Sequence, residues 1–204
     1  MNSLKRIQTI VNQISPINDR NQYELSNNNT ASIGLRELTI RAQTQRNEKS
    51  QPSKVLNGLE ELKTFVGKEI GTSNYFKITQ DRVNEFAEAT GDFQWIHIDP
   101  ERATQESPFG GPIAHGFLIL SLAPMFADEI MPKVEGIKYG VNYGFNKIRF
   151  VSPVMVGANL RCKFELQELT EIAGGAQSVI KLTFETEGSS KPSAICEWII
   201  RYYN

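Results

Sequence analysis

The chain has 204 residues, and its 22 Lys and Arg against 23 Asp and Glu give a net charge of −1 at pH 7. Apolar residues make up 40% and charged residues 22%, which excludes a wholly disordered chain. The near-zero charge argues against nucleic-acid binding, which requires a basic face. No apolar run reaches the roughly 18 residues that a membrane span needs. Two cysteines are too few for a disulfide framework, and the N-terminus lacks the apolar core of a secretory signal, so we expect a cytoplasmic protein.

The first 55 residues differ in composition from the rest of the chain. They hold eight basic and four acidic residues, 14 Asn and Gln, and a single aromatic residue. Because such a segment cannot easily bury a core of its own, we interpret residues 1–55 as a polar, partly disordered extension and residues 56–204 as the folded domain. A short, basic amphipathic helix is predicted from apolar residues at helical spacing: Leu4, Ile7, Ile10, Val11 and Ile14. A transit peptide has a similar pattern, but packing against its own domain or a partner is the simpler interpretation.

Short elements are expected at the start of the folded domain. Residues 57–65 predict a short helix, and the aromatic and β-branched residues within 75–78 predict a strand. Thr79 is a suitable N-cap for a following helix. The apolar face of that helix recurs until Thr90 and Gly91, where the glycine is expected to end it.

The middle of the chain is expected to form a loop and then a buried helix. Residues 92–112 are rich in Gly and Pro, as loops are. Residues 114–127 (AHGFLILSLAPMFA) are apolar on nearly all sides, which predicts a buried helix that Pro124 kinks or ends early. Four strands are predicted after it, near 144–152, 157–168, 177–186 and 193–203. This order is an α+β layout, which a long apolar helix laid across one curved antiparallel sheet would satisfy.

The two histidines of the chain lie on either side of the Gly- and Pro-rich loop. Asp92 and His97 are five residues apart, so they could hold one water between them, with the acid as base and the imidazole as orienter or acid. The structural alternative is that Asp92 caps the next turn and His97 is a hydrogen-bonded, partly buried residue. A zinc or iron site of Asp92, His97, Asp99 and His115 is a further alternative, although their spacing matches no metal-ligand motif.

The start of the predicted buried helix, His115-Gly116, is a second feature with chemical potential. The first N–H groups of a helix have no internal partner, and a glycine lets a ligand approach the backbone. An enolate or thioester oxygen placed there would be stabilised as in an oxyanion hole. Gly116 equally permits tight packing of the helix start. Ser121 needs a partner for its hydroxyl in an otherwise apolar helix, and the carbonyl one turn back commonly supplies it.

Three motifs occur in order along the chain: residues 91–97 (GDFQWIH), 99–103 (DPERA) and 110–116 (GGPIAHG). Three later segments follow them: residues 141–145 (VNYGF), 149–150 (RF) and 153–157 (PVMVG). Together they resemble the MaoC-like dehydratase family, which includes the (R)-specific enoyl-CoA hydratases, and its branch similar to nodulation protein N. The resemblance covers about residues 60–203. It implies a hotdog fold, in which an antiparallel sheet wraps a long central helix, usually paired as a homodimer.

The resemblance also implies a reaction, the reversible hydration of a trans-2-enoyl thioester to a (3R)-hydroxyacyl thioester. The substrate would be a thioester of coenzyme A or of an acyl-carrier protein, and no cofactor or metal would be needed. Asp92 would match the family's catalytic acid and His97 its catalytic histidine, which together activate and orient a water. A hotdog acyl-thioesterase and a non-catalytic acyl-binding module are the alternative functions.

The same resemblance implies substrate-binding residues around that pair. The backbone N–H of Gly116 would match the family's oxyanion donor, next to His115 at the start of the helix. Ser121 falls where the family often has a serine that supports the site. Gln94 stands where the family usually has Asn, and because it is one methylene longer we expect it to support the site rather than reach the substrate.

Overall fold

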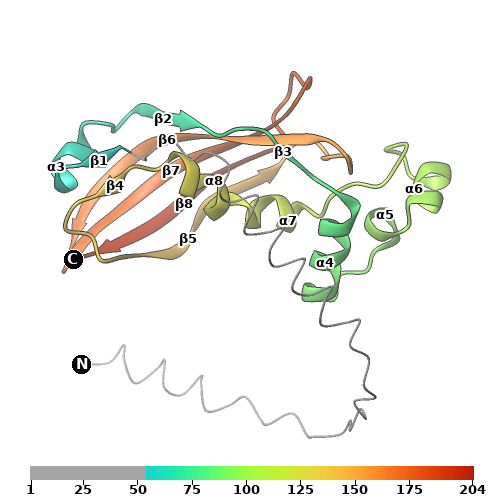
Figure 1. Cartoon of the computed structure of the whole chain (residues 1–204), viewed down its shortest axis with the longest axis horizontal. Helices are drawn as coiled ribbons and strands as arrows, with labels where there is room; N and C mark the ends of the chain where they lie inside the picture. Colours follow the sequence, from blue (N-terminus) through green and yellow to red (C-terminus); the bar gives the residue numbers. More distant parts are fainter. Residues whose placement is uncertain (1–53) are drawn as a thin grey trace, which may run out of the picture. The chain divides into compact units, whose positions relative to one another are not determined.

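The computed structural model describes residues 54–204, and the expectations for residues 1–53, including the amphipathic helix, lie outside the described residues. One curved antiparallel sheet dominates the described part (Figure 1). Its strands are β2 (Lys68–Thr72), β3 (Phe76–Lys77), β5 (Tyr139–Phe150), β6 (Asn159–Ile172), β7 (Gly175–Thr186) and β8 (Ala194–Tyr203). They pair in the order β2-β6-β7-β8-β5, and β3 also pairs with β6. The α+β layout predicted from the sequence is therefore present.

Three of the long strands show the alternating burial of a sheet with one covered face. In β6 every second side chain from Leu160 to Leu166 is buried, and the residues between them are partly exposed. The neighbouring strands continue the same buried face with Ile180, Leu182, Phe184, Cys196, Trp198 and Ile200. This face forms the greater part of the hydrophobic core.

The fourth long strand, β5, begins at Tyr139 rather than near residue 144 as predicted. Residues 139–143 (YGVNY) include a glycine and an asparagine, which are poor strand formers, so local sequence does not indicate the extension. Pairing with β8 supplies it, because Tyr139 lies opposite Tyr203 and their rings stack at 5.3 Å. Register shifts later in β5, between Phe145 and Ile148, bend its far end.

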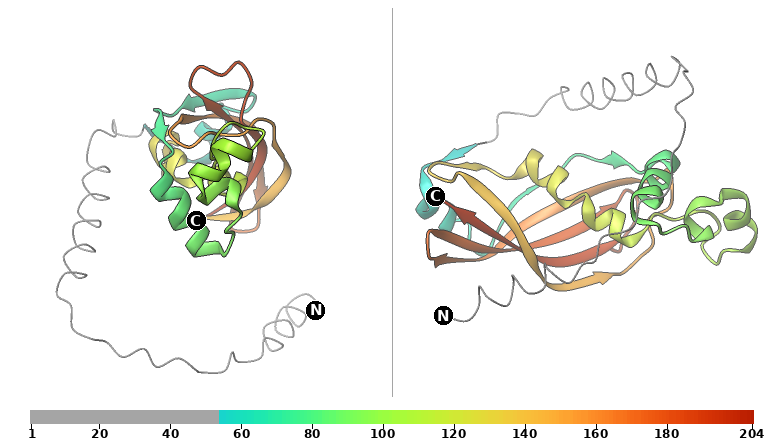
Figure 2. Two further views of the ribbon diagram at one scale, coloured as in Figure 1. Left: turned by 90° about the vertical axis from the view of Figure 1, so that its right-hand side faces the viewer. Right: turned by 90° about the horizontal axis from the view of Figure 1, so that it is seen from below.

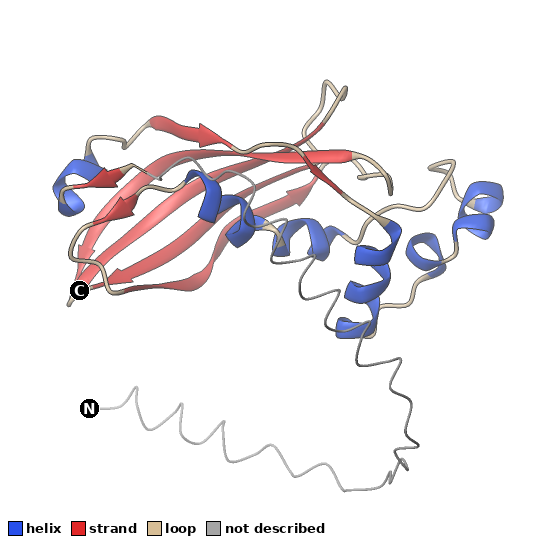
Figure 3. Cartoon of the chain, in the orientation of Figure 1, coloured by secondary structure: helices blue, strands red, loops and turns tan. Residues whose placement is uncertain are grey.

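Helices lie along the inner side of the sheet and at both of its ends (Figures 2 and 3). The helices are α3 (Gly58–Lys63), α4 (Gln80–Thr90), α5 (Trp95–Ile98), α6 (Pro100–Glu106), α7 (Gly116–Ser121) and α8 (Ala123–Ile130). Helix α8 packs against β2 and β6. Its Phe126 meets Phe76 and Phe184 edge to face, at ring distances of 6.5 and 6.3 Å. Phe126 therefore anchors α8 in the core.

Helix α4 follows the sequence prediction closely. The Thr79 hydroxyl accepts a hydrogen bond from the Arg82 N–H, which caps the first turn. The helix ends at Gly91, which adopts a left-handed conformation with φ of 77°. Val83 and Ala87 form its buried face. The chain thus leaves α4 at a fixed point, one residue before Asp92.

Two expectations for the middle of the chain are wrong in detail. The segment 92–112 is not all loop, because it contains α5 and α6. Asp99 caps α6 through its side chain, and Pro100 occupies the first helical position, where its missing N–H costs nothing. The predicted long helix is divided at Leu122 into α7 and α8, with Pro124 in the first turn of α8. It is also not buried all round, since the Phe117 side chain is 68% exposed.

A second, two-stranded sheet lies beside the main one. In it, β1 (Val55–Leu56) pairs in parallel with β4 (Lys133–Val134). Val55, which the sequence interpretation placed in the extension, is therefore part of a paired strand. Among residues 54–204, no helix has the length and apolar character needed to cross a membrane.

The aromatic contacts of Phe126 predict the cost of removing it. We expect Phe126→Ala to lower the free energy of unfolding by about 3–5 kcal/mol, because it leaves a cavity between α8 and the sheet. Urea denaturation followed by circular dichroism measures this change. Asp128→Ala, an exposed position on the same helix, is the matched control and should change stability by less than about 0.5 kcal/mol. Equal effects of the two substitutions would contradict the anchoring role.

Candidate active site

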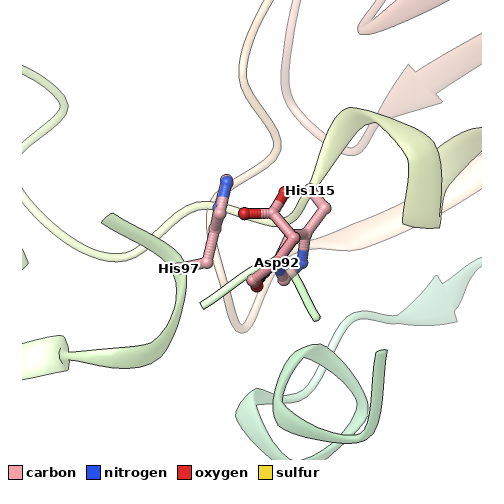
Figure 4. Close-up of side chains that lie close together, drawn as sticks. All are labelled: Asp92, His97 and His115. Atoms are coloured by element: carbon pink, nitrogen blue, oxygen red, sulfur yellow. Dashed lines mark hydrogen bonds between the residues drawn. The ribbon is translucent and has the colours of Figure 1, made fainter. Parts of the chain in front are cut away.

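Asp92, His97 and His115 come together at the end of α4, on α5 and at the start of α7 (Figure 4). One nitrogen or carboxylate oxygen of each lies within 4.8 Å of the others. The two imidazole rings are stacked, with centroids 3.9 Å apart and planes inclined by 30°. The two histidines are buried, whereas Asp92 is exposed. The structure therefore unites both histidines of the chain with the acid that the sequence pairs with His97.

His97 is held in one orientation and one tautomer by the main chain. Its Nδ1 lies 2.7 Å from the carbonyl oxygen of Ile113. Because a carbonyl only accepts hydrogen bonds, Nδ1 must carry the hydrogen and Nε2 must be the free acceptor. The backbone carbonyl of His97 also accepts a bond from the Gln80 side chain at 2.8 Å. The ring thus presents an unprotonated Nε2.

The environment of His97 favours its neutral form. Burial lowers the pKa of His97, and the adjacent His115 lowers it further. The bond to Ile113 and the negative charge of Asp92 act in the opposite direction, but they do not cancel the effect of burial. The pKa therefore lies below its ordinary value of 6.5, and His97 is a neutral acceptor at pH 7.

Asp92 follows the left-handed Gly91 and turns its carboxylate toward the histidines. Its Oδ1 also accepts a bond from the Gln94 N–H at 3.4 Å, so Asp92 caps the turn that leads into α5. The structural interpretation of Asp92 is therefore present, and its carboxylate also lies near the histidines. The second oxygen and the remaining lone pairs are available to a ligand.

A cavity of about 300 Å³ opens beside this cluster, lined by both His97 and Gly116. Most of its wall is apolar and includes Ile119 of α7 and Phe150 at the end of β5. Gly116 is the first residue of α7, so its N–H has no partner within the helix. A side chain at this position would be crowded, because a Cβ would lie 3.2 Å from the Phe150 ring. The glycine thus gives access to the backbone at the cavity wall.

Ser121 and Gln94 do not reach this cavity. The Ser121 hydroxyl donates to the Leu118 carbonyl at 2.8 Å, and its side chain is exposed. It therefore makes the local backbone bond that was the alternative to a supporting role. Gln94 is exposed and acts through its main chain, since its carbonyl accepts from the His97 N–H at 3.0 Å. Its contacts with the site are therefore main-chain ones, to His97 and to the Asp92 carboxylate.

The metal-site alternative fits this geometry poorly. Asp99 caps α6 and is not a member of the cluster that the described residues form. The cluster offers three ligand atoms, one each from Asp92, His97 and His115. The four-ligand zinc or iron site that includes Asp99 is therefore not assembled by the described residues.

Part of the cavity wall could not be found from the sequence. Ile119 of α7 and Ser193, just before β8, line it with residues that follow β5, and these parts meet only in the folded chain. Ile119 resembles an ordinary core residue in sequence, and no local signal distinguishes it or Ser193. Phe150, Pro153 and Val154 are signalled weakly, through the later segments that resemble the nodulation-like branch.

The comparisons with known proteins agree with this fold. The sequence profile of the MaoC like domain matches residues 61–188. A 3-hydroxyacyl-thioester dehydratase of Mycobacterium tuberculosis is 43% identical over 150 residues, which cover 73% of this chain and 98% of that protein. Nodulation protein N of Rhizobium meliloti is 42% identical over 142 residues, which cover 69% of this chain and 88% of that protein. The chain belongs to the MaoC-like domain family.

Solved structures show the same architecture. An Archaeoglobus protein described as a monoamine oxidase regulatory protein superposes with a TM-score of 0.63 at 22% identity, covering 76% of this chain and 99% of that one. An (R)-hydratase of A. caviae superposes with a TM-score of 0.56 at 24% identity, covering 66% of this chain and 94% of that one. The hotdog fold is thereby confirmed, with the central helix divided into α7 and α8.

The Phe150 contact predicts the effect of a methyl group at residue 116. We expect Gly116→Ala to lower kcat/KM at least about tenfold, because the Phe150 ring must move into the cavity or α7 must shift away from it. Steady-state kinetics with an enoyl thioester measures the loss. Gly144→Ala is the control, because a Cβ there has no neighbour within 4 Å. Unchanged kinetics in Gly116→Ala would show that this backbone does not approach the substrate.

The environment of His97 predicts its titration. Since its pKa in the folded protein lies below 6.5, the NMR titration midpoint of the His97 ring should fall below that value. In Asp92→Asn it should fall further, because the opposing negative charge is gone.

The lowered pKa of His97 also predicts how the stability of the protein changes with pH. Below the unfolded-state pKa of about 6.5, the unfolded chain binds a proton that the folded His97 does not, so this group lowers stability as the pH falls through that range. Above it the contribution is constant. A His97 midpoint above 6.5 would contradict both expectations.

Proposed function

We propose that this protein catalyses the reversible hydration of a trans-2-enoyl thioester to a (3R)-hydroxyacyl thioester, as a hydro-lyase. Two observations carry the proposal: a carboxylate oxygen of Asp92 lies within 4.8 Å of a ring nitrogen of His97, and His97 lines a largely apolar cavity together with Gly116. The name of the mycobacterial relative, a 3-hydroxyacyl-thioester dehydratase, supports the same reaction.

The two side chains suit the activation of one water. A water between them donates one hydrogen to the Asp92 carboxylate and the other to His97 Nε2, which leaves an oxygen lone pair directed at C3 of the substrate. As the C–O bond forms, Asp92 takes the proton and negative charge develops on the thioester oxygen. The N–H of Gly116 stabilises that charge. The proton then passes to C2 of the enolate, so water is added as a whole and no net proton is released.

The substrate proposal follows from the cavity. Its apolar wall, with Ile119, Phe150 and Val154, suits a hydrocarbon acyl chain, and the polar groups gather where the thioester would lie. The thiol would be coenzyme A or an acyl-carrier protein. No cofactor is proposed beyond this thioester, because acid–base chemistry by the chain's own groups completes the reaction.

A homodimer and a cytoplasmic location belong to the same proposal. Strand β5 is the last strand of the sheet. Its exposed apolar and aromatic side chains are Tyr139, Val141, Tyr143 and Phe150, and Phe117 of α7 is exposed as well. A second copy would cover both this face and the free strand edge, and sedimentation velocity tests that arrangement.

The cytoplasmic location is supported by Cys162 and Cys196, which are buried and unpaired, as in a reducing compartment.

Asp92→Asn tests the function. We expect this exchange to lower kcat with crotonyl-CoA by roughly 10²- to 10⁴-fold while substrate binding persists, because the base is lost but the cavity is not. The assay follows loss of the enoyl-thioester absorbance together with release of free thiol. Asp128→Asn, an exposed acid on α8, is the matched control and should retain full activity.

Three outcomes separate the alternatives. Loss of the enoyl band without free thiol, abolished only in Asp92→Asn, supports the hydratase. Release of thiol by the wild type indicates the acyl-thioesterase instead. Binding without any turnover of coenzyme A and carrier-protein substrates indicates a non-catalytic acyl-binding module.

A further inference from the structure

His115 is a buried, polar side chain that the mechanism above does not use. Only 2% of its surface is exposed. Its ring lies between two aromatic neighbours, His97 with centroids at 3.9 Å and Phe86 of α4 at 5.1 Å. Its position is one residue before Gly116, at the N-cap of α7. His115 therefore contacts His97 and the backbone of Asp92, and it directly precedes Gly116.

The hydrogen bonds of His115 define its tautomer. Its Nε2 lies 3.0 Å from the backbone carbonyl oxygen of Asp92. Since that oxygen can only accept, Nε2 must carry a hydrogen, and in the neutral ring Nδ1 is then bare. Nδ1 is buried and has no hydrogen-bond partner among the described residues. The stacked histidines are thus held in opposite tautomers, with the hydrogen of His97 on Nδ1 and that of His115 on Nε2.

The bond to Asp92 is the shortest contact that fixes this exposed residue. The Asp92 N–H reaches the Thr90 hydroxyl at 3.4 Å, and Oδ1 accepts from the Gln94 N–H at 3.4 Å. Both distances are at the limit of a hydrogen bond, and both partners belong to the same turn. The bond from His115 is shorter and comes from a residue 23 positions away. It alone among these contacts ties the turn to α7.

We propose that His115 is a positioning residue of the reaction, which locks the Asp92 main chain to the start of α7 and supports the face of the His97 ring. The inference rests on the proposed hydratase function. One side chain thereby sets the spacing between the base, the imidazole and the oxyanion donor. A displacement of about 1 Å between such groups can cost roughly 100-fold in rate.

Three variants of His115 separate the loss of its hydrogen-bond donor from the loss of its packing. In His115→Gln the amide nitrogen reaches the place of Nε2, so the bond to Asp92 is kept, whereas His115→Asn reaches only the place of Nδ1. His115→Phe keeps the stacked ring and lacks the donor. We expect kcat to fall roughly 100-fold in the Phe and Asn variants and less than about tenfold in the Gln variant. KM should change less than threefold in all of them, because the cavity wall does not include His115.

Histidine NMR supplies a readout independent of turnover. The chain contains two histidines, so a long-range ¹H–¹⁵N correlation spectrum of the histidine-labelled full chain shows two imidazoles, and His115→Gln assigns them. We expect the Nδ1–H tautomer for His97 and the Nε2–H tautomer for His115. Protonation of His115 on Nδ1, or full activity of a folded His115→Phe variant, would overturn the proposal.

The outcomes also distinguish this inference from the proposed function. If the wild type turns over no enoyl thioester but shows the opposite tautomers, the function fails and the positioning geometry stands. If His115→Phe does not fold, the comparison of Gln with Asn carries the test, because both are polar and differ in the reach of the amide. Equal activity in that pair would overturn the positioning role.

Discussion

The extended segment 112–114 is the constraint on which the candidate site depends. Ile113 is bonded to α5 twice, because its N–H donates to a carbonyl there at 3.0 Å and its own carbonyl accepts from His97 at 2.7 Å. On the other side of the segment, the Ala114 N–H donates to the Val154 carbonyl at 2.8 Å. The segment therefore joins the His97 imidazole to the cavity wall through main-chain groups. Since the backbone itself sets the tautomer of His97, this part of the site is independent of most side-chain changes nearby.

The site divides its polar groups between a buried and an exposed layer. His97 and His115 are enclosed, while Asp92 stands at the surface. Burial keeps His97 neutral, so it can accept a hydrogen bond from water. The Asp92 carboxylate is exposed, so solvent reaches it. The site thus offers two hydrogen-bond acceptors, a buried imidazole and an exposed carboxylate. One water molecule can donate a hydrogen to each of them.

The sequence predicts those features of the fold that are set locally, and it misses those set by pairing. The caps at Thr79 and Gly91 depend on neighbouring residues, and both ends of α4 are predicted correctly. The residue types of the inner strands likewise indicate where these strands lie. The early start of β5 depends on pairing with β8, which no local pattern records. In the site, the spacing of Asp92 and His97 indicates their pairing. For Ser121 the structure shows the local carbonyl bond that was one of the two expectations, and not the supporting role that the resemblance implies.

The break between α7 and α8 separates the helix that is anchored in the core from the helix that begins at the candidate site. Helix α8 is fastened to the sheet by Phe126, whereas α7 exposes Phe117 and carries Gly116 at its start. The Phe150 ring that faces Gly116 lies at the end of β5, beyond the register shift that follows Phe145. A bulge turns the strand that carries it, so the position of this ring depends on an irregularity in the sheet as well as on its own side chain. The width of the cavity therefore depends on the positions of both the start of α7 and the end of β5. Substitutions in β5 that leave the core packed can still alter which substrates the cavity accepts.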